Sequence, residues 1–242
     1  MTDRTVLALT GADREPFLQG LISNDVTRAQ GGIIYAALLT PQGKYIADFF
    51  VIGLPDTLLI DVASPLAATL TQRLAMYKLR ADVQITTSDL RLSRGTGPAP
   101  AGAQPDPRHP ALGWRHYGDG TLSDTTDWDA VRVAHCIPES GIELTPDSYV
   151  LESGFEALHG VDFRKGCYVG QEVTARMKHK TELKKGLATV TVNGPADPGT
   201  EITANGKPAG TLFTRSGNHA IAYLRFDRTD QMRAGQATIT LN

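Results

Sequence analysis

From Lys185 onward the hydrophobic pattern changes to a period of two residues, and this change restricts the possible folds more than any other feature of the chain. Residues 187–192 alternate between a Leu/Thr/Thr set and an Ala/Val/Val set, as in a β-strand whose successive side chains point to opposite faces. Asn205-Gly206 is the preferred dipeptide of a two-residue hairpin turn, because both residues tolerate positive φ. About 58 residues of this kind predict a small antiparallel barrel or sandwich.

The part of the chain before this segment mixes strand and helix signals. Apolar runs between residues 33 and 60 predict strands. Ser64-Pro65 and Thr145-Pro146 each place a capping hydroxyl before a proline, the residue favoured at the first helical position. Two helices are therefore expected to start at these dipeptides, and the boundary to the C-terminal strands falls near the basic stretch 178–185.

Residues 94–110 have a different composition from the rest of the chain. Five of these 17 residues are proline and three are glycine, a density that disrupts both helices and sheets. We expect a flexible loop without regular structure over residues 94–110. A proline-rich partner motif is the alternative interpretation.

Composition excludes several functional classes. The chain has 24 Lys+Arg and 26 Asp+Glu, a net charge of −2, which argues against a general polyanion binder. Two cysteines rule out a disulfide scaffold and a self-contained four-cysteine zinc or iron–sulfur site. No apolar run approaches the roughly 20 residues of a spanning helix, and the N-terminus does not resemble a signal peptide. We expect a reducing, cytoplasmic location, with free thiols and without membrane insertion.

The densest chemical signal is the segment 164–172, Arg-Lys-Gly-Cys-Tyr-Val-Gly-Gln-Glu. The residues after Gly170 favour a helix, which places Cys167 just ahead of a helix N-terminus. Amide dipoles there, together with Arg164 and Lys165, favour a thiolate that can act as a nucleophile or a soft-metal ligand. A buried structural cysteine is the alternative, and a protease-type nucleophile lacks a histidine with a supporting local signature.

A second signal is an acidic residue within an apolar strand. Strand alternation places Asp48 on one face with Ile46, Phe50 and Ile52. An unpaired carboxylate on such a face is expensive to bury, so Asp48 either pairs with a cation or lines a ligand pocket. Asn24 precedes the previous strand and either caps a turn or contacts a ligand.

Positive charge gathers between residues 161 and 185, where seven Lys/Arg and three Asp/Glu give a local net charge of +4. This stretch is either a solvated basic face or a basic rim that faces an anionic ligand, such as a polyglutamate tail on a folate. Direct contact with RNA is a further alternative, although an aromatic-rich RNA motif is missing.

The segment 165–172 resembles the K-G-C-Y-x-G-Q-E signature of the YgfZ/Iba57 (Caf17-like) family, which is related to the glycine cleavage T-protein. The resemblance covers nearly the whole chain: F-L-Q-G at 17–20, N-D-V at 24–26 and the Q-G-x-x-x-x-D strand at 42–48 are similar to family segments. The octapeptide is specific to this family, whereas the N-terminal segments are shared with the wider superfamily.

The resemblance implies an α+β, T-protein-like fold. Two intertwined α/β subdomains would surround a central cavity over residues 1–183, and a small antiparallel β-barrel would occupy residues 184–242. A tetrahydrofolate-type ligand would bind at the centre. The family's functional cysteine and lysine map to Cys167 and Lys165. The implied cofactor-binding and loop-holding positions are Asp48, Asn24, Tyr168, Gln171, Glu172 and Arg176.

The resemblance also implies a role in assembly or delivery of [4Fe–4S] clusters without enzymatic turnover. Because a cluster takes four protein ligands, we expect Cys167 to supply one ligand of a transient cluster shared with an A-type carrier. Radical and other [4Fe–4S] enzymes would be the clients, with an indirect link to tRNA modification. We expect a monomer without direct nucleic-acid contact, in the cytoplasm or, in a eukaryote, the mitochondrial matrix.

A folate-dependent aminomethyl or methyl transferase of the T-protein type is the main alternative. The T-protein has two adjacent acids in the strand that corresponds to residues 42–48. This chain has Ala47 and Asp48 there, so one acid is missing, which disfavours aminomethyl transfer. An RNA-contacting modification factor, motivated by the basic stretch 176–185, is a third alternative.

Overall fold

The computed structural model describes residues 3–179 and 182–242. The chain forms two compact units, each built from separate stretches of sequence. The first unit contains residues 1–126 and 155–173, and the second contains residues 127–154 and 174–242. The barrel region predicted over 184–242 therefore lies within a unit that also includes two earlier stretches.

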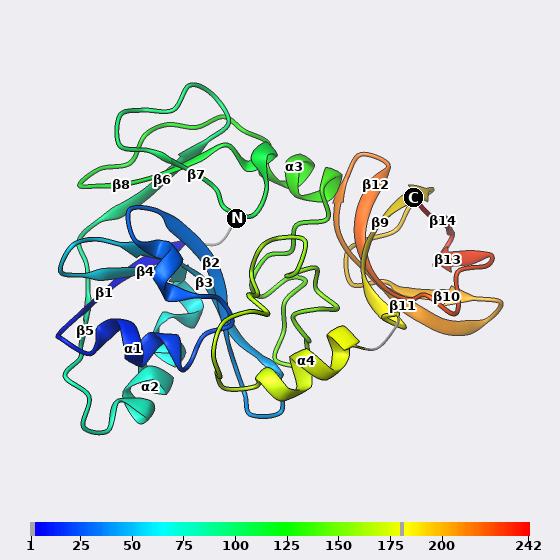
Figure 1. Cartoon of the computed structure of the whole chain (residues 1–242). Helices are drawn as coiled ribbons and strands as arrows, with labels where there is room; N and C mark the ends of the chain where they lie inside the picture. Colours follow the sequence, from blue (N-terminus) through cyan, green and yellow to red (C-terminus); the bar gives the residue numbers. More distant parts are fainter. Residues whose placement is uncertain (1–2, 180–181) are drawn as a thin grey trace. The chain divides into compact units, whose positions relative to one another are not determined.

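The first unit is built on a five-stranded antiparallel sheet with the strand order β2-β3-β4-β1-β5 (Figure 1). Three short or medium-length helical segments accompany it. The strands are β1 (Arg4–Thr10), β2 (Ile33–Leu39), β3 (Tyr45–Gly53), β4 (Leu58–Ala63) and β5 (Gln84–Thr87), and the helices are α1 (Arg14–Gln19), η1 (Val26–Ala29) and α2 (Ser64–Lys78).

One face of this sheet packs against α2 in a continuous apolar core. Phe49 and Val51 of β3 belong to the same buried cluster as Leu70 and Leu74 of α2. Burying a side chain of this size contributes about 1.5–3 kcal/mol. The helix begins at Ser64 with proline in its first turn, which confirms the predicted start. The predicted capping role of Ser64 is wrong, because its hydroxyl bonds the Thr5 hydroxyl at 2.8 Å and the helix has no side-chain cap.

A second, three-stranded sheet in the first unit has the order β6-β8-β7. Its strands are β6 (Arg91–Gly95), β7 (Gln104–Pro105) and β8 (Trp114–Gly118), and the short helix η2 (Pro110–Leu112) lies between β7 and β8 in the chain. The prediction that residues 94–110 lack regular structure is therefore wrong at residues 94–95, 104–105 and 110. Pro105 is accommodated because it lies on the edge strand β7 of the sheet, where a missing N–H costs little.

The second unit contains the helix α3 (Trp128–Ala134) and a closed barrel with the order β10-β11-β12-β9-β14-β13. Asn205 and Gly206 have φ values of 50° and 73° and connect β10 to β11, which confirms the predicted hairpin turn. Helix α4 (Gln171–His179) begins in the first unit and ends in the second. The barrel strands are β9 (Lys185–Asn193), β10 (Glu201–Ala204), β11 (Lys207–Ser216), β12 (His219–Arg225), β13 (Met232–Ala234) and β14 (Ala237–Leu241).

The helix predicted to start at Thr145-Pro146 does not form, and residues 145–154 make a series of turns. Ser148 explains the first turn, because its hydroxyl accepts a hydrogen bond from the Thr145 N–H at 3.0 Å. Such local side-chain bonds compete with the helical backbone pattern. Gly154 then reverses the chain at a φ of +78°. Within the part of the chain that is described, no helix has the length and apolar character needed to cross a membrane.

Candidate functional site

The cysteine-containing loop, residues 162–170, begins with a carboxylate that organises its backbone. The Asp162 Oδ1 atom accepts hydrogen bonds from the N–H groups of Arg164 at 2.7 Å and Lys165 at 3.2 Å. The Asp162 N–H donates to the Ser23 carbonyl at 3.0 Å. The start of the loop is thus tied to a segment about 140 residues earlier in the sequence. The sequence analysis did not single out Asp162, although an aspartate two residues before a polar turn is a recognisable signal for this geometry.

Lys165 ties the loop to the same early segment. Its ammonium donates to the backbone carbonyls of Gln19 at 2.7 Å, Ile22 at 2.6 Å and Asn24 at 3.0 Å. An ammonium has three protons, so these three acceptors use its full donor capacity. Burial lowers the pKa of Lys165 to about 8, although the charges of Asp25 and Asp162 oppose that shift. The predicted functional lysine therefore fastens the loop to the early segment.

Asn24 fixes the early segment in turn. Its side-chain amide donates to the carbonyls of Tyr35 and His159, both at 2.8 Å, and its oxygen accepts the Asp25 N–H at 2.8 Å. The side chain is 3% exposed. These contacts give Asn24 the turn-forming role that the sequence left as one of two alternatives, and its predicted ligand role stays a prediction.

Cys167 is exposed on the loop, as are Phe163, Arg164 and Gly166. Lys165 and Tyr168 on either side are each 8% exposed, and the Lys165 Nζ atom lies 5.0 Å from the centroid of the Tyr168 ring. Gly166 has no heavy atom within 4 Å of the position that a Cβ would occupy. The thiol therefore sits on an anchored backbone with open space beside it.

The end of the loop is packed against the turn that precedes β3. Gly170 has a φ of +84°, and a Cβ there would lie 2.6 Å from the carbonyl oxygen of Thr40. Gly43 in that turn has a φ of +74° and packs closely against Val173. Glycine is required at both positions, because the backbone has a positive φ and a neighbouring residue lies too close for a Cβ atom. Helix α4 then begins at Gln171, as predicted from the residues after Gly170.

The remaining residues predicted around the loop differ in exposure. Gln171 is half-buried, and its N–H donates to the Tyr168 carbonyl at 3.2 Å. Glu172 and Arg176 are exposed on α4. Arg176 belongs to the second unit, whereas Cys167, Tyr168 and Glu172 belong to the first.

Asp48 lies on the face of β3 opposite the apolar core and is 3% exposed. Its two oxygens accept hydrogen bonds from the hydroxyls of Tyr35 at 2.9 Å and Tyr45 at 2.6 Å. The Tyr35 ring stacks on Phe155 with centroids 4.9 Å apart and is tilted to Phe50 at 5.2 Å. A buried acceptor beside stacked rings fits the chemistry of a pterin, which needs an acceptor for its N–H groups and apolar surfaces for its faces.

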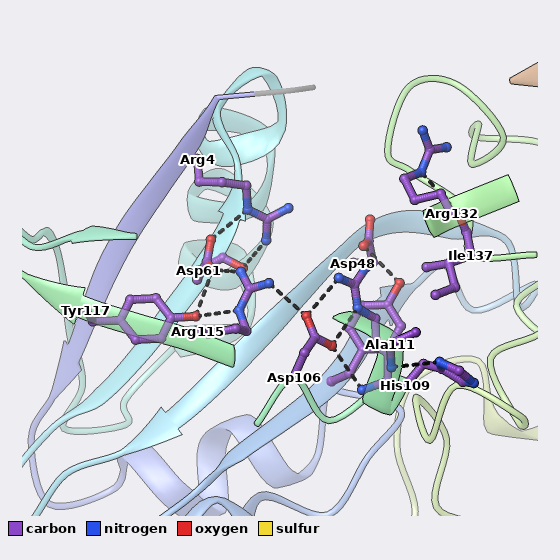
Figure 2. Close-up of polar contacts among 12 residues, drawn as sticks. Arg4, Asp48, Asp61, Asp106, His109, Ala111, Arg115, Tyr117, Arg132 and Ile137 are labelled. Atoms are coloured by element: carbon purple, nitrogen blue, oxygen red, sulfur yellow. Dashed lines mark hydrogen bonds and ion pairs between the residues drawn. The ribbon is translucent and has the colours of Figure 1, made fainter. Parts of the chain in front are cut away.

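A buried ion network, missed by the sequence analysis, covers the same sheet face (Figure 2). Asp61 of β4 pairs with Arg4 at 2.7 Å and with Arg115, and Arg115 also pairs with Asp106 at 3.0 Å. Burial alone would raise the pKa of Asp61, but Arg4 and Arg115 hold that pKa below its ordinary value. Asp106 is bound by Arg108 at 2.9 Å. Asp61 within the apolar strand β4 was the available signal, because a buried acid requires a cation.

The described residues offer no group of three or more His, Cys, Asp or Glu side chains able to hold a metal ion. Cys167 therefore has no further metal-ligating cluster beside it within residues 3–179 and 182–242. A metal cluster bound at this thiol needs ligands from another molecule.

The fold is similar to that of a glycine cleavage T-protein. The structure matches a glycine cleavage system aminomethyltransferase T from Bartonella henselae with a TM-score of 0.75 and 14% identity, covering 98% of this chain and 81% of that chain. At this identity the match establishes the fold alone. Residues 184–242 match the family model of the CAF17 C-terminal beta-barrel domain.

Sequence comparison identifies the family. The chain is 30% identical to the mitochondrial iron-sulfur cluster assembly factor IBA57 of Mus musculus, covering 92% of this chain and 75% of that protein. The Homo sapiens protein of the same name is also 30% identical, with 91% and 75% covered. A Neurospora crassa homologue is 32% identical, and the match spans about half of that longer protein, 51%. This chain belongs to the IBA57 family.

Proposed function

We propose that this chain acts in the assembly or delivery of [4Fe–4S] clusters and that Cys167 supplies one ligand to a cluster shared with an A-type carrier. The observation that carries the proposal is the exposed thiol of Cys167, which lies on an anchored loop between the buried residues Lys165 and Tyr168. A cluster ligand must be reachable by a partner and must stay in place, and Cys167 meets both conditions. Membership of the IBA57 family, whose relatives are named iron-sulfur cluster assembly factors, supports the same role.

The number of ligands that a cluster needs supports a shared cluster. A [4Fe–4S] or [2Fe–2S] cluster takes four protein ligands, and the described residues provide one exposed cysteine without an adjacent group of metal-ligating side chains. The carrier would contribute the remaining thiolates. Clients would be radical and other [4Fe–4S] enzymes, and an effect on tRNA modification would follow indirectly through such clients. The protein would act as a monomer, in the cytoplasm or, in a eukaryote, in the mitochondrial matrix.

The contacts of Lys165 support an assembly factor over an enzyme. A general acid or base must exchange a proton with the substrate, whereas the three protons of the Lys165 ammonium are engaged by backbone carbonyls. The loop thus offers Cys167 as a ligand, and the protons of the Lys165 ammonium are engaged by the backbone and not directed at a substrate.

A tetrahydrofolate-type ligand is the second part of the proposal. Asp48 would accept hydrogen bonds from the pterin, since its buried carboxylate bonds the Tyr35 hydroxyl and the Tyr35 ring stacks on Phe155. When bound, such a ligand supplies a one-carbon carrier, which is the basis of the alternative aminomethyl or methyl transferase function. Titration with 5-formyltetrahydrofolate tests this part: Asp48→Asn should weaken binding at least about 10-fold, and sustained product formation from a one-carbon donor would favour the transferase.

Cluster transfer to an apo client tests the first part. The chain is incubated anaerobically with a cluster-loaded A-type carrier and an apo [4Fe–4S] enzyme, and the recovered client activity is measured. We expect Cys167→Ser to abolish the stimulation and Cys136→Ser, its matched control, to retain it. Equal stimulation by both variants would contradict the ligand role of Cys167.

A further inference from the structure

We propose that Lys165 is a positioning residue: its ammonium, held in a cage of three backbone carbonyls, fixes the loop that presents Cys167. The cage consists of the carbonyl oxygens of Gln19, Ile22 and Asn24. The use of Cys167 as a cluster ligand rests on the function proposed above, whereas the cage is a separate property of the fold and is tested separately.

The geometry of the cage suits an ammonium ion. Three donors meet three acceptors at 2.7, 2.6 and 3.0 Å, and hydrogen bonds from a charged donor are about twice as strong as neutral ones. The Gln19 carbonyl ends helix α1, where carbonyls lack an intrahelical donor and carry partial negative charge. Lys165 supplies the donor that this helix end requires.

The cage is rigid because side chains hold the segment that forms it. The Gln19 amide donates to Asp25 at 3.1 Å, and its oxygen accepts the Val26 N–H at 2.8 Å. Asn24 bonds two further backbone carbonyls through its amide. The Ser23 hydroxyl donates to the Gly160 carbonyl at 2.6 Å. The carbonyls therefore keep their place, and Lys165 transmits that place to the loop.

The short distance along the chain makes the cage effective at the thiol. Two residues span at most about 7 Å, so fixing Lys165 confines Cys167 to a small region. Lys165 is 8% exposed whereas Cys167 is exposed, and Gly166 between them leaves open space where a side chain would stand. The buried Lys165 anchors the loop, and the exposed Cys167 is available to a partner protein.

The test compares Lys165→Met with Arg164→Gln. Lys165→Met keeps the aliphatic stem and removes the ammonium, and Arg164→Gln removes a neighbouring exposed charge that is outside the cage. Amide hydrogen exchange over residues 162–168 reports the fixation of the loop, and alkylation of Cys136, in the second unit, reports unfolding that extends beyond the first unit. We expect Lys165→Met to accelerate exchange at 162–168 at least about 10-fold and to reduce cluster transfer by a similar factor. Arg164→Gln should leave exchange at 162–168 within about twofold.

Chemical rescue separates the cage from a general loss of stability. Lys165→Ala should regain slow exchange with n-butylammonium, whose N–H groups can bond the cage, and should not respond to tetraethylammonium, which has no N–H donor. If Lys165→Met also accelerates alkylation of Cys136, this comparison shows whether the faster exchange comes from loss of the cage or from a general loss of stability. Failure of n-butylammonium to restore slow exchange would then overturn the proposal.

Three other results would also overturn the proposal. Unchanged exchange at 162–168 in Lys165→Met would show that the cage does not fix the loop. Faster exchange with full cluster transfer would show that fixation is not needed. Lost transfer with unchanged exchange would show that Lys165 acts directly on the cluster or the partner. If the wild type itself transfers no cluster, the proposed function is wrong. Hydrogen exchange and chemical rescue still test whether the cage around Lys165 fixes the loop.

Discussion

The two cysteines of the chain lie in opposite environments, one in each compact unit. Cys167 is exposed on a loop that is fixed by Lys165 and packed at Gly170. Cys136 follows helix α3, is half-buried and has a φ of +51°. Burial raises the pKa of the Cys136 thiol to about 11, although a hydrogen bond with Thr189 opposes this shift.

This difference shows that the fold separates an exposed thiol from a sheltered one. At Cys136 the side chain is sheltered and the backbone adopts a left-handed conformation that costs free energy in residues other than glycine. At Cys167 the side chain is open to solvent and the neighbouring backbone is held by hydrogen bonds to a distant segment. Fixed backbone with an exposed thiol is the arrangement that a shared metal ligand requires.

The largest expected effect is on cluster transfer from the carrier. Cys167→Ala should reduce transfer to the level of the carrier alone, because the single exposed cysteine is lost. Cys136→Ala should retain transfer within about twofold. Client activity after anaerobic incubation measures both. Comparable losses in the two variants would remove the distinction between the cysteines.

Alkylation by iodoacetamide should separate the two thiols by about 100-fold or more at pH 8. With a pKa of about 11, about one Cys136 thiol in a thousand is a thiolate at pH 8, and the thiolate is the reactive form. The Cys136 rate should therefore rise with pH up to about 11. Mass spectrometry of the labelled peptides measures each rate. A Cys136 rate that levels off below pH 9 would contradict this account.

Substitution at the two glycines of the loop should affect stability unequally. Gly170→Ala combines a positive φ with an approach of 2.6 Å to the Thr40 carbonyl and should cost about 2–4 kcal/mol in the free energy of unfolding. Gly166→Ala meets open space and should stay within about 0.5 kcal/mol. Urea unfolding followed by circular dichroism measures both. Equal costs would show that the end of the loop is not packed as described.

The smallest expected effect concerns the neighbour of the buried thiol. Thr189→Val removes a hydrogen bond that lowers the pKa of Cys136, so the pKa should rise and Cys136 alkylation should slow a few-fold. The Cys167 rate serves as the internal control and should not change. Faster labelling of Cys136 would indicate that the substitution opens its surroundings.

Local patterns in the sequence predicted the elements that depend on neighbouring residues. The period of two after Lys185, the Asn205-Gly206 turn and the helix start at Ser64-Pro65 were all correct, because each depends on contacts within a few positions. The helix predicted at Thr145-Pro146 failed because the Ser148 hydroxyl forms a competing local bond.

Contacts between distant residues could not be predicted in this way. Lys165 and the Gln19 carbonyl are 146 positions apart, and nothing in either local sequence indicates the other. The strands within 94–110 were missed for the same reason, because Gln104 of β7 pairs with Arg115 of β8. The octapeptide pointed to the cysteine-containing loop as a candidate site, and the structure showed how that loop is held.

The most direct test of a cluster shared through Cys167 is spectroscopic. A [2Fe–2S]-loaded A-type carrier is mixed anaerobically with the chain, and visible circular dichroism is recorded for wild type, Cys167→Ala and Cys136→Ala. We predict a new spectrum with wild type and Cys136→Ala, and the unchanged carrier spectrum with Cys167→Ala. The same new spectrum with Cys167→Ala would contradict the account, because the cluster environment would then change without the proposed ligand.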